Sequence, residues 1–166
     1  MSEVRLIEST PAHLEALLDS RSALAEMLHS PVPDGWPMFP EAVQFTLDVL
    51  RRHPEQQSWW MHFFLDAGTG ALVGSGGFAG PPSEGTVEFG YEIAPEFRRR
   101  GYASAAARAM VAKAQTSGLV DRMIAHTLLG DPASSGVLRA SGFEHVGDVP
   151  DPEQGTVSEW ARTLRR

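Results

Sequence analysis

Residues 98–103 read Arg-Arg-Arg-Gly-Tyr-Ala, between the strand-like stretch Thr86-Val-Glu-Phe-Gly-Tyr-Glu-Ile93 and an alanine-rich run that ends before Gly118. This order predicts a strand, a basic glycine turn and a helix. A helix N-terminus carries roughly half a positive charge and points backbone N–H groups outward. Gly101 lets the backbone approach a ligand without a Cβ in the way, and three arginines supply counter-charge. The turn is therefore predicted to bind a pyrophosphate or a similar anion.

The turn fits neither of two common phosphate-binding motifs. It lacks the Gly-Lys-Ser/Thr of a P-loop, and its single glycine does not make a dinucleotide fingerprint. Spaced as Arg98-x-x-Gly101-x-Ala103, it resembles the acyl-CoA signature of the GNAT superfamily of N-acetyltransferases, [Gln/Arg]-x-x-Gly-x-[Gly/Ala]. The resemblance covers residues 59–148, and within the superfamily the chain looks most similar to the branch that acetylates ribosomal-protein alanines.

The periodicity of apolar residues predicts an α/β (α+β) fold with a mixed, mostly antiparallel sheet flanked by helices. The length of the chain suits a single domain over residues 1–166. A first helix begins at Pro11, capped by Thr10, and its leucine spacing continues to Leu28. The other helices are expected at Glu41–Arg52, Ala103–Ser117 and Ala133–Ser141. The strands are expected at Val4–Glu8, Trp59–Asp66, Leu72–Ala79, Thr86–Ile93, Arg122–Thr127 and Val157–Thr163.

Composition excludes several classes of function. A net charge of −7 argues against a nucleic-acid surface and favours a cationic substrate such as an amine. There is no cysteine, so disulfides and a cysteinyl thioester are excluded. The six histidines show no metal-ligand spacing, and we expect no metal. No apolar run suits a membrane span, and the N-terminal residues lack signal-peptide features, so a cytoplasmic protein without membrane contact is expected.

The resemblance implies acetyl-CoA as co-substrate and indicates the residues that would bind it. In the family, the end of the strand pairs with the pantetheine amides, the turn binds the pyrophosphate, and residues after a later strand contact CoA. Two positions depart from the family: Asp131 replaces an asparagine, and Leu138 replaces a tyrosine that acts as general acid. The implied CoA residues are Ile93, Ala94, Arg98, Arg99, Arg100, Gly101, Tyr102, Ala103, Ser104, Asp131 and Ser134.

Two carboxylates in the strand before the turn are the candidate catalytic residues. An alkyl ammonium group has a pKa near 10.4 and must lose a proton before the nitrogen can attack. Glu88 is the preferred base and Glu92 the second candidate. On strict alternation both share a face with Gly90, unless a bulge at Gly90 breaks the parity. The alternative is that both are surface carboxylates, and His126 is expected to be structural.

Four aromatic residues could line an acceptor pocket or belong to the core: Trp36, Phe39, Trp59 and Trp60. The predicted function is an N-acyltransferase that moves an acetyl group from acetyl-CoA to an amine by direct attack in a ternary complex. Small-molecule amines and protein N-terminal amines both remain possible acceptors, and the protein is expected to be a monomer or a homodimer. Two alternatives stay open: a non-catalytic acyl-CoA sensor, and an unrelated α/β protein whose turn binds another anion.

Overall fold

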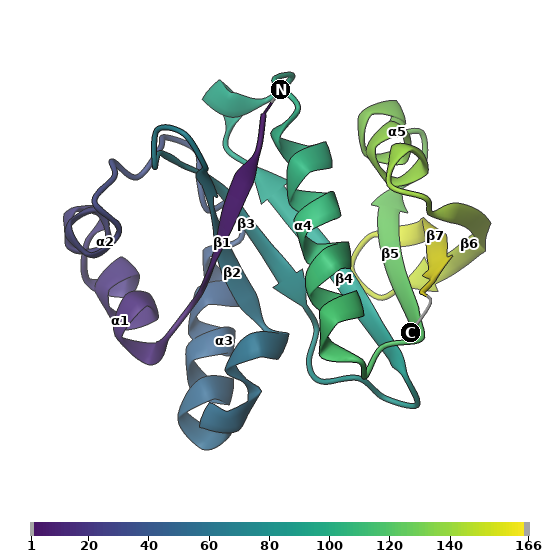
Figure 1. Cartoon of the computed structure of the whole chain (residues 1–166), viewed down its shortest axis with the longest axis horizontal. Helices are drawn as coiled ribbons and strands as arrows, with labels where there is room; N and C mark the ends of the chain where they lie inside the picture. The colour runs from purple at the N-terminus through teal and green to yellow at the C-terminus, as the bar shows by residue number, and fades with distance from the viewer. Residues whose placement is uncertain (1, 165–166) are drawn as a thin grey trace.

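The computed structural model describes residues 2–164 and contains one seven-stranded sheet in the order β1-β2-β3-β4-β5-β7-β6 (Figure 1). Every neighbouring pair is antiparallel except β4 and β5, which are parallel. The predicted mixed, mostly antiparallel sheet is therefore confirmed. The strands are β1 (Val4–Glu8), β2 (Met61–Asp66), β3 (Leu72–Phe78), β4 (Thr86–Ile93), β5 (Arg122–Leu128), β6 (Glu144–Asp151) and β7 (Gly155–Thr163).

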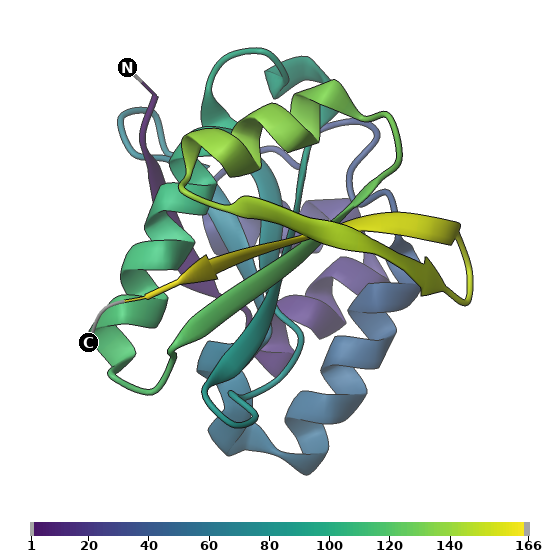
Figure 2. The same cartoon turned by 90° about the vertical axis from the view of Figure 1, so that its right-hand side faces the viewer.

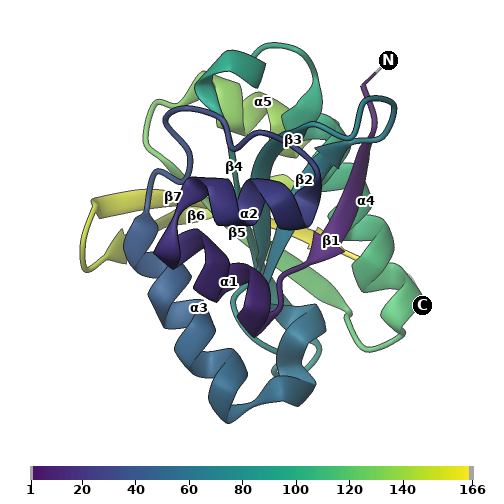
Figure 3. The same ribbon diagram turned by 90° about the vertical axis from the view of Figure 1, so that its left-hand side faces the viewer.

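Helices cover both faces of the sheet. Figure 3 shows α1, α2 and α3 gathered in front of one face, and Figure 2 shows α4 and α5 on the other. A separate cluster of buried apolar side chains fills each of the two layers. The helices are α1 (Pro11–Asp19), α2 (Arg21–Leu28), α3 (Pro40–Arg52), α4 (Tyr102–Ser117) and α5 (Pro132–Ala140), with 3-10 turns at Pro54–Trp59 and Pro95–Phe97.

The first helical segment is divided in two, which the leucine spacing does not reveal. Thr10 caps α1 as expected, since its hydroxyl accepts a hydrogen bond from the His13 N–H at 3.2 Å. Ser20 then adopts an extended conformation, with φ −162° and ψ 152°. Its hydroxyl accepts a hydrogen bond from the Ala23 N–H at 3.0 Å, so Ser20 both ends α1 and caps α2. Both helices bury leucines in the same layer, which is why the spacing looks continuous.

Strand β6 was not predicted from the sequence. It lies at the edge of the sheet, pairs only with β7, and exposes most of its side chains on both faces. Its register shifts between His145 and Gly147, and it contains Pro150. An exposed edge strand with a bulge and a proline lacks the apolar alternation by which a strand is recognised. The strand expected from Trp59 starts at Met61, because a 3-10 turn occupies Pro54–Trp59.

Strands β4 and β5 are joined only over a short stretch. Their pairing covers Thr86, Val87 and Glu88, and beyond these residues the two strands diverge (Figure 2). Helices α4 and α5 follow these parallel strands, so both helix N-termini lie at the end where the strands are apart. The fold therefore produces a gap in the sheet beside two helix N-termini. No helix among residues 2–164 is long and apolar enough to cross a membrane.

Candidate active site

Strand β4 has two chemically different faces. Val87, Phe89 and Ile93 are buried in the layer beneath α4, whereas Glu88, Gly90 and Glu92 point to the opposite face. The pairing of β3 with β4 runs from Phe78–Phe89 to Gly74–Ile93 without a register shift. Strict alternation therefore holds through Gly90, and the bulge considered from the sequence does not interrupt the pairing with β3. The two candidate carboxylates share one face.

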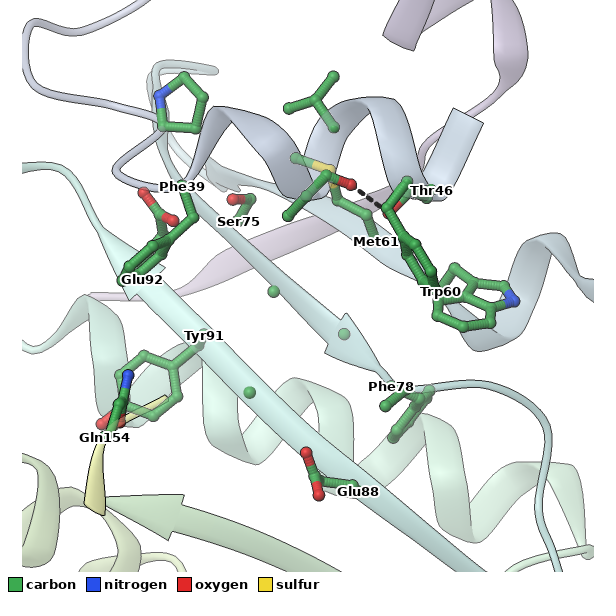
Figure 4. A pocket seen from close by; sticks show the side chains of 18 residues that line it. Phe39, Thr46, Trp60, Met61, Ser75, Phe78, Glu88, Tyr91, Glu92 and Gln154 are labelled. Atoms are coloured by element: carbon green, nitrogen blue, oxygen red, sulfur yellow. Dashed lines mark hydrogen bonds between the residues drawn. The ribbon is translucent and has the colours of Figure 1, made fainter. Parts of the chain in front are cut away.

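These carboxylates line a pocket of about 530 Å³ between β4 and α3 (Figure 4). Its floor is formed by β3 and β4, and its opposite wall by α3 and the residues before it. Most of the lining is aromatic or aliphatic, and the lining residues include no lysine, arginine or histidine. They are Pro37, Phe39, Ala42, Val43, Phe45, Thr46, Trp60, Met61, Ser75, Gly76, Gly77, Phe78, Ala79, Glu88, Gly90, Tyr91, Glu92 and Gln154.

The backbone of β4 presents hydrogen-bonding groups at the gap. The Ala79 N–H donates to the Glu88 carbonyl at 3.0 Å, and the Ala94 N–H donates to the Val73 carbonyl at 2.8 Å. Even-numbered residues of β4 therefore face β3, and odd-numbered residues face β5. Since β5 has diverged, Tyr91 and Ile93 turn their N–H groups toward a side where, within residues 2–164, no strand pairs with them. An extended ligand with amide groups could pair with this strand edge.

The turn before α4 has the conformation that the sequence predicts. Arg99 and Gly101 both adopt left-handed backbone angles, with φ of 63° and 84°. Gly101 precedes the first residue of α4, and among residues 2–164 no side chain caps this helix. The first backbone bond of the helix is from the Ala105 N–H to the Gly101 carbonyl, so Tyr102, Ala103 and Ser104 have N–H groups without an acceptor one turn earlier. Backbone N–H groups arranged in this way are able to bind an anion.

The residues of the predicted CoA turn do not all point the same way. The Arg98 guanidinium donates from Nε to the Ile93 carbonyl at 3.0 Å, so it ties the turn to β4. Arg99 and Arg100 are exposed, and Arg100 lies over the ring of Phe97 at 5.7 Å. The Tyr102 hydroxyl donates to Asp66 Oδ2 at 2.6 Å, which directs its ring toward the β2–β3 turn. Ala94 is buried.

Helix α5 begins beside the same gap. Asp131 caps the helix, because its Oδ1 accepts a hydrogen bond from the Ser134 N–H at 3.1 Å. Leu138 is fully within the core, where it cannot act on a substrate. From β4, the Tyr91 side chain reaches this helix start. Burial raises the pKa of Tyr91, hydrogen bonding with the Ser134 side chain opposes the rise, and the charge of Asp131 adds to it.

Glu92 contacts other segments through both its side chain and its backbone. Its Oε1 accepts a hydrogen bond from the Met38 N–H at 2.8 Å, which joins β4 to the loop before α3. Burial raises the pKa of the Glu92 carboxyl, while the Met38 bond and the charge of Arg98 oppose the rise. Its partner across the sheet is Ser75, whose hydroxyl accepts a hydrogen bond from the Trp36 indole at 2.9 Å.

Glu88 belongs to a row of titratable side chains that crosses three strands. Its Oε1 lies 3.3 Å from Nδ1 of His126, and Nε2 of the same imidazole lies 3.1 Å from Oε1 of Glu159. The strand pairing explains this, because His126 on β5 is directly opposite Glu159 on β7. The Glu88 side chain is about half exposed, and the other two are about one-quarter exposed. His126, expected to be structural, thus contacts the candidate base.

The residues of this site that sequence reasoning missed include Phe45, Tyr91, Gln154 and Glu159. Phe45 lies on the face of α3 that lines the pocket. Gln154 extends from the β6–β7 turn (Figure 4). Alternation along the predicted last strand would have placed Glu159 on the face opposite to that of its neighbour Trp160. Of the four aromatic residues considered, Phe39 and Trp60 line the pocket, Trp36 is buried in the core, and Trp59 packs against Phe78 at 5.3 Å.

Comparison with solved structures shows the same fold in several acetyltransferases. A chimera of the Vibrio cholerae spermidine N-acetyltransferase SpeG with hSSAT is 16% identical, with a TM-score of 0.70 over 98% of this chain and 96% of the other. RimL, a ribosomal L7/L12 α-N-protein acetyltransferase in complex with coenzyme A, is 18% identical, with a TM-score of 0.70 over 98% and 94%. The Salmonella typhimurium acetyltransferase that modifies the N-terminal serine of L7/L12 is 17% identical, with a TM-score of 0.69 over 98% and 96%.

The sequence itself matches a family. No curated protein sequence matches the chain. The family model described as an acetyltransferase (GNAT) domain, however, matches residues 3–144. This match covers most of the chain and includes the strand, the basic turn and the helix on which the resemblance rests. The chain therefore belongs to the GNAT family of acetyltransferases.

Proposed function

We propose that this acetyltransferase moves an acetyl group from acetyl-CoA to a primary amine by direct attack in a ternary complex. The observation that carries the proposal is the divergence of β4 from β5 beside the uncapped start of α4, with a carboxylate-bearing pocket on the adjacent face of β4. We assign the gap between β4 and β5 to the donor, acetyl-CoA, and the pocket beside β4 to the acceptor amine. Acetyl-CoA supplies the activated acetyl group as a thioester.

The donor would lie along β4 with its pyrophosphate at the turn. The N–H groups of Tyr102, Ala103 and Ser104 and the positive end of α4 would bind the phosphates. Arg99 and Arg100 would add counter-charge from exposed positions. The Tyr91 carbonyl and the Ile93 N–H, with which no strand among residues 2–164 pairs, would bond to the pantetheine amides, while the Ile93 carbonyl stays bonded to Arg98. Asp131 is occupied as a helix cap, so we expect it to act by starting α5 rather than by direct contact.

Two groups of Tyr91 would act at the reacting centre. Its backbone N–H would donate to the thioester carbonyl and stabilise the negative charge that develops on this oxygen. Its hydroxyl would donate a hydrogen bond to the departing sulfur from the side of α5, which Leu138 cannot do. Burial keeps the pKa of Tyr91 above its usual value, so the hydroxyl stays protonated at neutral pH. The thiol itself has a pKa near 8.5, so it leaves readily as the thiolate.

Glu88 would accept the proton that the acceptor ammonium must lose. The neutral amine then attacks the thioester carbonyl carbon and the C–N bond forms. The nitrogen gives its second proton to water, the C–S bond breaks, and CoA leaves as the thiolate. His126 contacts Glu88 at 3.3 Å and Glu159 at 3.1 Å, so it would hold the carboxylate toward the pocket and give the proton a path to the surface. Glu92 would attract the cationic amine while it orders the loop at Met38.

The experiment has two parts. Isothermal titration calorimetry measures acetyl-CoA binding, and a thiol reagent measures free CoA released with a panel of primary amines. Binding together with amine-dependent thiol release supports the proposal. Binding without release with any amine would indicate the non-catalytic sensor, and absence of binding would indicate that the turn accepts a different anion.

A further inference from the structure

We infer that the acceptor is a primary amine with a single positive charge and an aromatic or bulky apolar body. Its ammonium group would lie against Glu88, and its body against Phe39, Phe45 and Trp60. This inference rests on the proposed acetyl transfer to an amine and names the acceptor class. It separates this chain from enzymes that take extended polycations or peptide N-termini.

The wall opposite β4 is an aromatic surface that a ligand would cover. Phe39 is 50% exposed and Phe45 is 58% exposed, although both line the pocket. Phe45 packs edge-to-face on Trp60, with ring centroids 5.8 Å apart. Covering such exposed aromatic area with an apolar ligand removes it from water and stabilises the complex.

Three polar side chains of the wall and the floor already make hydrogen bonds within the protein. The Trp60 indole donates to Gln56 Oε1 at 2.9 Å, which fixes the ring and leaves its carbon surface to the pocket. The Thr46 hydroxyl donates to the Ala42 carbonyl at 2.8 Å within α3. The Ser75 hydroxyl accepts from the Trp36 indole at 2.9 Å. A peptide acceptor would bury its own amides against a mostly apolar lining with few hydrogen-bond partners, which is costly.

Charge is confined to one side of the pocket. Glu88 and Glu92 lie on β4, and the lining residues of α3 carry no charge. One ammonium group next to Glu88 is therefore compensated, whereas Glu92, roughly 13 Å further along β4, is already bonded to the Met38 N–H. A second ammonium further along a polyamine would lie on the aromatic wall without a carboxylate, and the nearby Glu159 already contacts His126. Charge complementarity thus favours a monoamine over a polyamine.

The floor leaves space for a flat group. A Cβ at Gly90 would meet no heavy atom within 4 Å, and the backbone there does not have a positive φ. A side chain at this position would therefore project freely into the pocket without backbone strain. A pocket of about 530 Å³ is within the range that small-molecule ligands use, roughly 300–1,000 Å³.

The test compares acceptors with the complete protein at saturating acetyl-CoA. The panel contains 2-phenylethylamine, tryptamine, spermidine and two peptides that begin with serine and alanine. We expect kcat/KM for the two aromatic amines to exceed that for spermidine and for the peptides by about tenfold or more. A preference for spermidine or for either peptide would overturn the inference and leave acetyl transfer intact.

Three variants test where the apolar body lies. Phe45→Ala should lower kcat/KM for 2-phenylethylamine by roughly five- to tenfold more than it lowers kcat/KM for ethylamine, which has no apolar body to contact the ring. Gly90→Val should lower the rate with 2-phenylethylamine more than with ethylamine, because it fills the floor. Leu119→Ala is the matched control, since Leu119 is 57% exposed and lies outside the pocket.

The outcomes distinguish this inference from the proposed function. If no amine in the panel releases CoA, the proposed acetyl transfer fails and the acceptor class fails with it. If amines are acetylated but Phe45→Ala and Gly90→Val affect aromatic amines and ethylamine equally, only the placement of the apolar body is wrong. Circular dichroism of each variant shows whether a loss of rate reflects a loss of fold.

Discussion

The imidazole Nδ1 of His126 lies 3.3 Å from Oε1 of Glu88. These residues are on β5 and β4, the two strands that diverge to form the gap, and they meet just where the pairing ends at Glu88. Glu88 therefore lies where the proposed donor site begins. Its side chain also lines the pocket on one face of β4. A carboxylate at this junction can reach both the acceptor amine and a histidine that leads to the surface.

Replacement of Glu88 by glutamine should keep the size of the side chain and remove its charge. We expect kcat to fall by roughly 10- to 1000-fold, the range for loss of a general base, while acetyl-CoA affinity is unchanged. The loss should shrink as pH rises, because more of the amine is already neutral. Steady-state rates between pH 6 and 9 check this, with Glu144→Gln as a control at an exposed carboxylate on β6.

Glu92 is the competing base, because its raised pKa makes it more basic. If Glu92→Gln abolishes turnover while Glu88→Gln leaves the rate and its pH dependence intact, the base is Glu92. We expect instead that Glu92→Gln raises KM for the amine, since it removes one of the two charges that attract the ammonium group. The two variants therefore separate proton transfer from amine binding.

Removal of the Tyr91 hydroxyl tests its proposed bond to the departing sulfur. Tyr91→Phe keeps the ring that stacks on Phe89 at 5.5 Å. We expect kcat to fall by about 10- to 100-fold and KM for acetyl-CoA to stay within about twofold. Since the pKa of Tyr91 is raised, ionisation should lower the wild-type rate only in strongly alkaline solution, and the variant should lack this decline. An unchanged kcat would show that the hydroxyl is only structural.

An aspartate in the turn before α4 should weaken CoA binding. Gly101→Asp places a negative charge beside the proposed pyrophosphate, and we expect at least a tenfold loss of affinity, or about 1.4 kcal/mol. Gly118→Asp is a matched control, because both glycines have positive φ and space around them, at opposite ends of α4. Calorimetry on the folded variants measures the difference. Equal affinities for the two variants would place the pyrophosphate elsewhere.

Acid should destabilise the fold through a buried histidine. His62 is fully buried beneath α4, its Nε2 lies 2.6 Å from Lys113 Nζ, and burial lowers its pKa to about 4. Between that value and about 6.5 the unfolded chain binds more protons than the folded one, so stability rises with pH through this window and is lost as pH falls. We expect His62 to contribute about 2 kcal/mol to the difference between pH 7 and pH 5.

Urea unfolding at both pH values checks this expectation. His62→Gln should reduce the change in unfolding free energy between pH 7 and pH 5, whereas His53→Gln, which removes a half-exposed histidine, should leave it nearly intact. A separate acidic contribution is expected from Glu8, whose pKa is lowered to about 2: burial opposes the shift, but hydrogen bonds from Lys113, Ser58 and Gln57 outweigh it. That contribution is lost as pH falls below about 4.5, so it has little effect on the comparison between pH 5 and pH 7.

The strand, turn and helix around Gly101 could be predicted because their signals are local. The glycine of the turn, the apolar alternation of the strand and the alanine-rich helix can each be recognised from residues that are close in the sequence. The fold class followed from the order of such elements. Strand β6 could not be predicted, because it is held by pairing with β7 and carries little apolar alternation of its own.

The candidate site was predicted only where one element determines it. Alternation placed Glu88 and Glu92 on one face, and the structure brings both to the same pocket. The contact of His126 with Glu88 depends on the parallel pairing of β4 with β5, which the sequence does not show. The contribution of Phe45 to the pocket wall depends on how α3 packs over the sheet. Whether the turn binds CoA, and which carboxylate is the base, stay predictions.

The most direct test of the account is whether the two substrates react while both are bound. Initial rates should be measured over a range of acetyl-CoA concentrations at several fixed concentrations of an accepted amine. Because the donor gap and the acceptor pocket meet along β4, and the chain has no cysteine, the account predicts double-reciprocal lines that intersect. Parallel lines, together with an acetylated protein detected by mass spectrometry before amine is added, would contradict direct transfer.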